Sequence, residues 1–276
     1  MNLQQLRQTF LNLRMRWPQT WPGFEKVVDS ALQQLGHTSD QALTPRFQAM
    51  HACIQDVAQK VEAFGNQQAR LGKEPDYHNR LHISDTVVAL TTLLLQQRAV
   101  DHRSAHDPLS GPEWQMLLAI CGHDLHHNGG FNRFTSDLEA QSLAALKPVM
   151  KHHGVWKQDQ AAVGHFILQT DPSLVKAMHL QVRSAPFDLK DLSCQTVLIQ
   201  EADILASALP QIGEDLTLKL SQEWAKLDTQ KSQSLLSVPA RVYFLREMAL
   251  FSSPASQRLG IQKLVDQHMA ALLKSA

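Results

Sequence analysis

Apolar residues along this chain recur at the three- and four-residue spacing of α-helices. Val87, Leu90 and Leu94 follow this period in one segment, and apolar residues in the range 191–209 follow it in another. The alternation of apolar and polar residues that marks a half-buried strand is absent, and β-branched clusters between turn residues are rare. The pattern therefore predicts an all-α protein.

Residues that break helices separate these segments. They are glycine, proline and short polar runs at 72–75, 107–112, 128–130, 171–172, 184–186, 239 and 252–254. The range 1–68 has a helical pattern too, and it contains Trp17 and Trp21, which we expect to be packing aromatics. No flexible or proline-rich linker separates it from the range 76–224. We therefore expect a single compact helical bundle over 1–276, with the helices of 1–68 packed on those of 76–224.

Composition and charge limit the partners. The 276 residues are 43% hydrophobic and 19% charged, which is ordinary for a globular protein with a real core. Lysine plus arginine and aspartate plus glutamate both number 26, so the formal net charge is zero. A neutral chain gives no support for binding nucleic acid or an anionic membrane surface. We expect neither as a partner, and the composition leaves the oligomeric state open.

Three features favour a cytoplasmic location. Cys53, Cys121 and Cys194 are odd in number and far apart, which fits buried thiols in a reducing compartment. The first residues lack a basic run followed by an apolar stretch, so no signal peptide is expected. The longest apolar stretch, 87–95, contains two threonines and is shorter than the about 20 residues that span a bilayer.

The chemistry concentrates in the middle of the chain, because 11 of the 14 histidines fall between His78 and His179. Two short segments, 77–82 and 123–132, place histidines at spacings that suit a metal ion. Histidine nitrogen and aspartate oxygen are ligands of borderline and hard divalent cations. The sequence therefore predicts a metal centre built from both segments.

Helix geometry indicates how these residues meet. His78 and His82 are four apart and would project from one face of a helix that starts near Asp76. His123 and Asp124 are adjacent and would point about 100° apart on a regular helix. Both can reach one ion at the end of their helix, or if the aspartate bridges two ions.

A further ligand is expected to be an acid from a distant helix. Asp203 is our candidate, because it lies in an otherwise apolar helical run. A lone buried carboxylate is costly unless it is paired or bound to a metal. The glycines in 128–130 are expected to end the preceding helix and to permit close approach of backbone and ligand.

These motifs resemble those of the HD-domain superfamily of metal-dependent phosphohydrolases, and within it the catalytic domain of the class I cyclic nucleotide phosphodiesterases. That family carries Tyr-His-Asn-x-x-His, matched at 77–82, and His-Asp-x-x-His-x-Gly-x-x-Asn-x-Phe, matched from His123 to Phe134. Weaker matches lie at 167–171, at 202–205 and at Glu223-Trp224. The similarity covers residues 76–224, and it implies a helical bundle of the HD-domain type.

The resemblance implies a role for each matched position. The first metal would be held by His82, His123, Asp124 and Asp203. The aspartate of the adjacent pair would also bridge to a second metal, whose other ligands are mostly water. His78 would donate the proton to the leaving oxygen. Residues around the metal-bound waters and the substrate would be Tyr77, Asn79, His127, Asn132, Glu139 and Thr170.

The chain departs from the family pattern mainly where the substrate is concerned. Asparagine stands at 128 where proline is usual, and Leu205 and Ala206 replace a serine and an asparagine. Gln257 matches the glutamine of the family's purine-clamping Gln-x-x-Phe, but the phenylalanine is missing. The spacing from Asp124 to Asp203 is also shorter than in that family. The resemblance therefore implies the metal chemistry more firmly than the substrate.

The expected reaction is hydrolysis of a nucleotide-like phosphate ester, such as a cyclic nucleotide. Two imidazoles and two carboxylates leave open positions for water on a six-coordinate ion. Two ions bridged by a carboxylate can share a hydroxide that attacks phosphorus in line, and His78 supplies the proton to the leaving alkoxide. We expect Zn²⁺ or Fe²⁺ at the histidine-rich position and Mg²⁺ or Mn²⁺ at the water-rich one.

Two other functions stay open. A diiron oxygenase of the HD architecture would use further histidines after the His-Asp pair, for which the candidates are His152, His153 and His179. The first two otherwise fit a solvated helix end. A nucleotide-binding module that has lost activity is disfavoured, because every expected metal ligand is present. Glu139 could equally cap its helix, and we expect His126 to be a variable pocket or surface residue.

Overall fold

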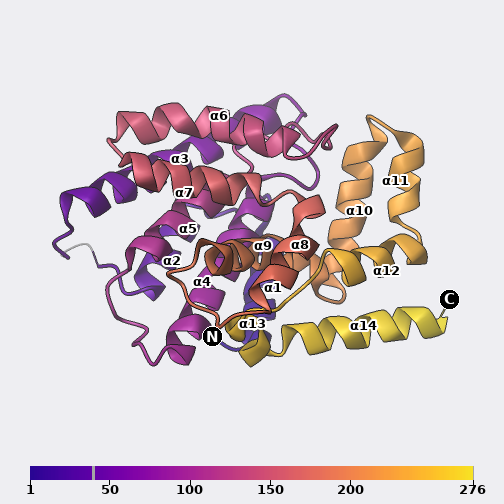
Figure 1. The fold of residues 1–276 in the computed structure, drawn as a ribbon. Coiled ribbons are helices and arrows are strands. Elements are labelled where there is room, and N and C mark those ends of the chain that lie inside the picture. The colour runs from indigo at the N-terminus through magenta and orange to yellow at the C-terminus, as the bar shows by residue number, and fades with distance from the viewer. Residues whose placement is uncertain (39–40, 276) are drawn as a thin grey trace.

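A computed structural model describes residues 1–38 and 41–275. Within these ranges the chain forms fourteen α-helices and no strand (Figure 1). The compact all-α fold predicted from the apolar period is therefore confirmed. In chain order the helices are α1 (Leu3–Arg16), α2 (Phe24–Gln34), α3 (Pro45–Arg70), α4 (Arg80–Val100), α5 (Gly111–Gly122), α6 (Asp137–His152), α7 (Lys157–Leu168), α8 (Pro172–Val182), α9 (Leu192–Ala208), α10 (Ile212–Ala225), α11 (Thr229–Leu235), α12 (Val238–Glu247), α13 (Pro254–Leu259) and α14 (Ile261–Ser275).

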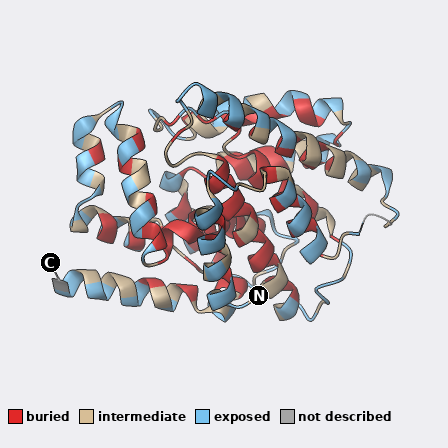
Figure 2. Ribbon diagram, turned by 180° about the vertical axis from the view of Figure 1, so that it is seen from behind, coloured by how far each residue is buried: buried red, intermediate tan, exposed pale blue. Residues whose placement is uncertain are grey.

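Two helices, α4 and α9, lie in the middle of the molecule and pack against each other (Figure 1). Both are buried on nearly all sides, and buried residues concentrate at the centre of Figure 2. A helix that is covered on every side needs few exposed polar positions, which explains the dense apolar runs in these two segments. The metal ligands predicted at 82 and 203 lie on these central helices.

One continuous apolar core joins the N-terminal helices to the rest of the molecule. It contains Leu6 of α1, Phe24 of α2 and Ile54 of α3, together with Leu118 of α5 and Leu205 of α9, all fully buried. Helix α2 packs against α4, and α3 packs against α5. The N-terminal helices thus form part of the wall around the central pair.

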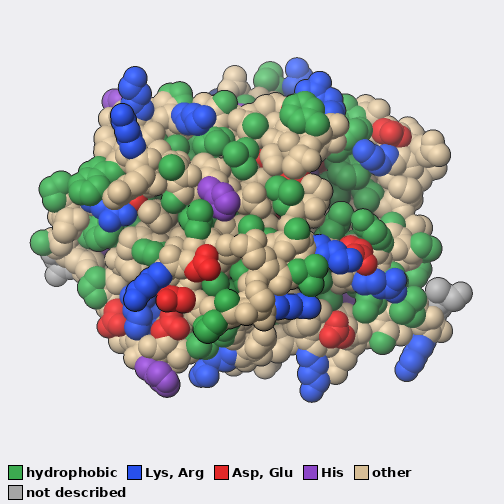
Figure 3. All heavy atoms as spheres, in the orientation of Figure 1, with side chains coloured by type: hydrophobic (Ala, Val, Ile, Leu, Met, Phe, Trp, Pro, Cys, Tyr) green, Lys and Arg blue, Asp and Glu red, His purple; other side chains and the backbone are tan. Residues whose placement is uncertain are grey.

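The distribution of surface charge and the burial of the cysteines are consistent with the neutral composition and the widely spaced thiols. No helix within the described residues is long and apolar enough to cross a membrane. Charged side chains of both signs are interspersed over the face drawn in Figure 3, so this face offers no extended area of one sign. Cys53, Cys121 and Cys194 are free thiols and are buried, as expected.

A buried arginine ties α3 to the segment that precedes α4. Arg80 donates hydrogen bonds to Glu62 and Asn66 of α3 at 2.6 Å each, and to Glu74 at 2.8 and 3.0 Å. Gly65 of α3 makes room for this side chain, because a Cβ at that position would lie 2.3 Å from Arg80 Cδ. The arginine network therefore fixes the loop that leads into α4.

We expect Gly65→Ala to lower the free energy of unfolding by about 1–3 kcal/mol, the usual cost of forcing extra atoms into a packed site. The added methyl would displace the Arg80 side chain from its carboxylate partners. Chemical denaturation measures the change. In an Arg80→Ala background the same substitution should be neutral or stabilising, because alanine favours the helix over glycine. Equal destabilisation in both backgrounds would show that Arg80 is not the obstacle.

Candidate metal centre

Four side chains from three parts of the fold converge on one point. His82 lies in the first turn of α4, His123 and Asp124 lie at the C-terminal end of α5, and Asp203 lies in α9. Nε2 of His82 is 3.3 Å from an oxygen of each aspartate. Nε2 of His123 is 3.4 Å from Asp124 Oδ2 and 3.3 Å from Asp203 Oδ1. The structure thus brings together the four residues expected to hold the first metal, here called the ligand cluster.

The end of α5 allows adjacent residues to share this point. The helix stops at Gly122, His123 is its C-cap residue, and Asp124 follows in a turn. A regular helix would have held the two side chains about 100° apart. The meeting at a helix end is one of the two arrangements expected from the sequence. The glycines of 128–130 lie beyond the helix end and do not themselves terminate it.

The expectation that one helix carries both His78 and His82 is wrong. Helix α4 begins only at Arg80, because Asn79 has an extended backbone with φ −123° and ψ −177°. The Asn79 side chain accepts hydrogen bonds from the backbone N–H groups of residues 81 and 82 and so caps the helix. His78 therefore lies in the loop before α4, and it reaches the site from the loop.

The ligand cluster fits a divalent cation. Among the described residues, His123 Nε2 and Asp124 Oδ2 are buried atoms without a hydrogen-bond partner. The Nδ1–H of His123 donates to the carbonyl oxygen of Ile120 at 2.8 Å, which turns Nε2 toward the aspartates, where it can bind a proton or a metal ion. A lone pair that faces carboxylates is repelled unless positive charge lies between them. Imidazole nitrogen and carboxylate oxygen are suitable ligands for such a charge.

The pKa values of the cluster reflect the same need for positive charge. Burial disfavours a charged His123, but Asp124 and Asp203 raise its pKa to about 9. Burial also disfavours an ionised Asp203, but His123 and His82 lower its pKa to about 2. Both groups therefore favour an arrangement in which the carboxylates are ionised and hold positive charge between them. A divalent cation would supply that charge and displace the protons.

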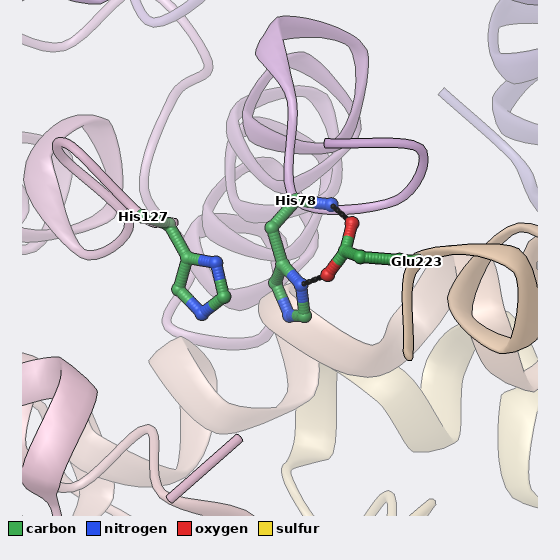
Figure 4. Close-up of side chains that lie close together, drawn as sticks. All are labelled: His78, His127 and Glu223. Atoms are coloured by element: carbon green, nitrogen blue, oxygen red, sulfur yellow. Dashed lines mark hydrogen bonds and ion pairs between the residues drawn. The ribbon is translucent and has the colours of Figure 1, made fainter. Parts of the chain in front are cut away.

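Beside the ligand cluster, His78 forms a hydrogen-bonded pair with Glu223 of α10 (Figure 4). The Nδ1–H of His78 donates to Oε1 at 2.5 Å, and Oε2 accepts from the backbone N–H groups of Tyr77 and His78 at 2.7 and 3.0 Å. Burial opposes ionisation of Glu223, but His78 and these N–H groups lower its pKa to about 2. The carboxylate fixes the tautomer, so Nε2 of His78 is free to give or take a proton.

The ring of His127 stacks on that of His78, with centroids 3.9 Å apart and planes 27° apart (Figure 4). Nδ1 of His127 accepts from the backbone N–H of Gly129 at 3.1 Å, so Nε2 carries the proton. Burial and the neighbouring His78 lower the pKa of His127 to about 3, and the ring is therefore neutral. It offers an N–H donor beside the ligand cluster.

The side chains of His78, His127 and Glu223 lie close enough to be considered as a second metal group, with one ligand atom of each within 4.8 Å of the others. Two observations argue against this use. Stacked rings direct their in-plane lone pairs side by side, not to one ion. The Nδ1 atoms of both histidines are already engaged in hydrogen bonds. The trio is better suited to handling a proton than to holding a metal.

Asn132 and Glu139 form a second pair near the cluster. The Nδ2 of Asn132 donates to both carboxylate oxygens of Glu139, at 3.1 and 2.9 Å. Glu139 lies in the first turn of α6. Burial raises its pKa to about 7, and the negative charges of Asp171 and Asp124 contribute to the rise. The pKa of Glu139 is therefore influenced by the charge of Asp124 in the ligand cluster. The residue also lies at the start of a helix, as the alternative interpretation expected.

Three other predicted site residues have their polar groups engaged with the protein. The hydroxyl of Tyr77 lies 2.8 Å from Ser207 Oγ, and its ring centre is 4.7 Å from that of His82. The amide NH₂ of Asn79 donates to two backbone carbonyls of the preceding loop. Thr170 is buried, and its hydroxyl donates to a backbone carbonyl of α7. These contacts position the segments that carry the cluster.

The histidines considered for an oxygenase lie outside both groups that could hold a metal among the described residues. Nε2 of His153 pairs with Asp56 at 3.0 Å, and Nδ1 of the fully buried His179 lies 2.8 Å from Ser252 Oγ. His152 is exposed at the end of α6, as expected for a solvated helix end. No described contact ties these three residues to the ligand cluster.

Sequence reasoning missed the role of Glu223. The residue was matched only as part of a weak Glu-Trp motif, and no partner was assigned to it. It lies 145 positions after His78, so no local pattern links the two. The sequence shows only an acid within a helical segment. The structure shows that this acid is buried in α10. A buried acid needs a partner, but its identity follows only from the fold.

Comparison with known proteins adds no family to these observations. No protein-family model matches the chain, and no curated protein matches it. The fold and the site define an all-α chain in which His82, His123 and Asp203 form a group that could hold a metal ion, with Asp124 beside both histidines. This geometry therefore carries the functional argument.

Proposed function

We propose that this chain is a metal-dependent phosphohydrolase, most specifically a phosphodiesterase that hydrolyses a nucleotide-like phosphate ester. The observation that carries the proposal is the placement of the His78–Glu223 pair directly beside the ligand cluster. The rings of His78 and His82 have their centres 5.7 Å apart. A cation site and a proton donor on opposite sides of one reacting group are what phosphate ester hydrolysis requires.

In this proposal His82, His123, Asp124 and Asp203 would hold one cation, and Asp124 would also serve as a ligand of a second. A bound divalent cation would lower the pKa of a coordinated water and neutralise charge on the phosphate oxygens. Two imidazoles and two carboxylates favour Zn²⁺ or Fe²⁺ at the cluster. A neighbouring position with Asp124 as its main protein ligand favours Mg²⁺ or Mn²⁺, which retain water readily.

His78 delivers the proton to the leaving oxygen. Glu223 accepts a hydrogen bond from its Nδ1–H, so Nε2 is the nitrogen that passes the proton. The neutral His127 offers its Nε2–H to negative charge on the phosphate or on water. Glu139, with its pKa raised to about 7, can exchange a proton near neutral pH, and Asn132 orients it.

The free buried thiols fit a reducing compartment, so we propose a cytoplasmic location.

A metal-supplemented screen tests the proposed function. We expect turnover of at least one phosphodiester when the protein is assayed with Mn²⁺ or Mg²⁺ against cyclic nucleotides, 2′,3′-cyclic nucleotides, nucleoside monophosphates and p-nitrophenyl diesters. Exhaustive chelation should abolish it, and added metal should restore it. Activity that survives chelation would contradict the proposal. Turnover of a small polar substrate that requires dioxygen would favour the oxygenase.

A further inference from the structure

A cavity opens beside the ligand cluster, and α3 forms one of its walls. Its enclosed space is small, about 20 Å³, and the larger volume of about 310 Å³ around it includes open solvent. Asp124, His78 and His127 reach it from the site described above. The rest of the wall includes Val61, Phe64, Gly65 and Gln68 of α3, together with Glu74, Arg80, Ile83 and His126. A group attached to a phosphate held at the cluster would therefore lie along α3 at the solvent-open part of the cavity.

The two charged side chains of this wall neutralise each other. Arg80 donates to both carboxylate oxygens of Glu74, at 2.8 and 3.0 Å, and Arg80 is further bonded to Glu62. No unpaired cation therefore lies among the described residues that line the cavity, apart from groups that face the cluster. A second phosphate or a carboxylate would find no partner there, and the wall suits a neutral group.

Two neighbouring aromatic rings, Phe64 and His126, lie on this wall and are here called the Phe64–His126 ledge. The rings of Phe64 and His126 have their centroids 4.6 Å apart and their planes tilted by 42°. Residue 126 has a φ of +64°, a left-handed backbone that non-glycine residues rarely adopt and that often marks functional sites. Both rings line the cavity. Flat rings stack well on such a surface.

The side-chain amide of Gln68, on the same wall, can form hydrogen bonds with the edge of a bound ring. Gln68 is partly exposed, lines the cavity and makes no side-chain hydrogen bond within the part of the chain that the structure describes. The glutamine near the C-terminus lies elsewhere. Gln257 is exposed, its amide donates to the carbonyl oxygen of Ser252 at 3.0 Å, and it does not line the cavity. The base is therefore not expected to bind at that position.

We propose that Phe64, Gln68 and His126 form the substrate-recognition subsite of this chain, and that it takes a single uncharged aromatic ring, such as a nucleobase, attached to the phosphate held at the ligand cluster. The inference rests on the proposed function for the placement of the phosphate. It assigns recognition to the N-terminal helix α3, outside the segment that carries the metal motifs. The ring stacks on the Phe64–His126 ledge, and the Gln68 amide bonds to its edge.

Equilibrium binding tests the subsite without requiring turnover. The probes are four hydrolysis-resistant nucleoside phosphonates, one for each base, with methylphosphonate as the ringless probe, all added to the metal-loaded protein. At least one nucleoside phosphonate should bind more tightly than methylphosphonate. Phe64→Ala should weaken the binding of that probe by about 5- to 150-fold, the usual range for loss of one base–aromatic stack. Binding of methylphosphonate should be unchanged.

Matched variants separate recognition from folding. His126→Asn removes the ring but tolerates the left-handed backbone, and Gln68→Ala removes the amide; both should weaken the nucleoside probe selectively. Gln67→Ala, an exposed neighbour on the same helix, should have no effect. Equal binding of all five probes to the wild type would overturn the subsite, as would a preference that survives all three variants. Selective nucleoside binding without any ester hydrolysis would uphold the subsite and reject the proposed function.

Discussion

Replacing Asp124 by alanine is expected to remove most of the bound metal and to lower turnover by about 10³-fold or more, because a cation stabilises the transition state by several kcal/mol. Asp124, like Asp203, faces both imidazoles of the ligand cluster, with Oδ2 at 3.3 Å from His82 and 3.4 Å from His123. Its Oδ2 is buried and has no hydrogen-bond partner among the described residues. Loss of this oxygen therefore removes a ligand that nothing nearby replaces.

Metal content by elemental analysis and turnover on the same preparation measure this effect. Asp56→Ala is the matched control, because Asp56 also pairs with a histidine, His153, but has no described contact with the ligand cluster. It should keep the metal and the activity. Circular dichroism should show that both variants remain helical. A wild-type metal content in Asp124→Ala would refute the assignment of this residue as a ligand.

The second large effect is expected at His78. His78→Ala should retain the metals and the helical fold, yet lose about 10²–10⁴-fold in rate on a substrate with a poor leaving group. The reason is that an alkoxide leaves only with a proton, and in the proposed reaction the proton comes from Nε2 of His78, whose Nδ1 is held by Glu223. A p-nitrophenyl ester leaves as a stable anion, so its hydrolysis should fall much less. The methyl and p-nitrophenyl esters of thymidine 5′-monophosphate provide the comparison.

Two further variants sharpen this test. Glu223→Gln keeps a hydrogen-bond acceptor for the imidazole but removes the charge that stabilises its protonated form, so it should show a smaller loss with the same dependence on the leaving group. His152→Ala, an exposed histidine, should change neither metal content nor rate. An equal loss on both esters, accompanied by metal depletion, would mean that His78 is a ligand or a structural residue.

The sequence by itself determined the fold class and indicated which residues are candidate metal ligands. The apolar period of 3.6 is a local property, set by which side chains must face a core, so the absence of strands was predictable from the pattern. The ligand residues were recognisable because each lies in a short motif or, for Asp203, because a lone acid in an apolar helix needs a partner. Even the meeting of His123 and Asp124 at a helix end was among the expected arrangements.

Only the tertiary structure decided how these residues are used. The cap formed by Asn79 places His78 in a loop, because side-chain hydrogen bonds to the first N–H groups compete with one more helical turn. The partner of His78 is Glu223, 145 positions away, and the wall of the cavity comes from α3, outside the metal motifs. Such pairings arise when packed helices bring distant side chains together and bury them. Local spacing therefore predicts which residues carry the chemistry, while long-range packing decides which of them face each other.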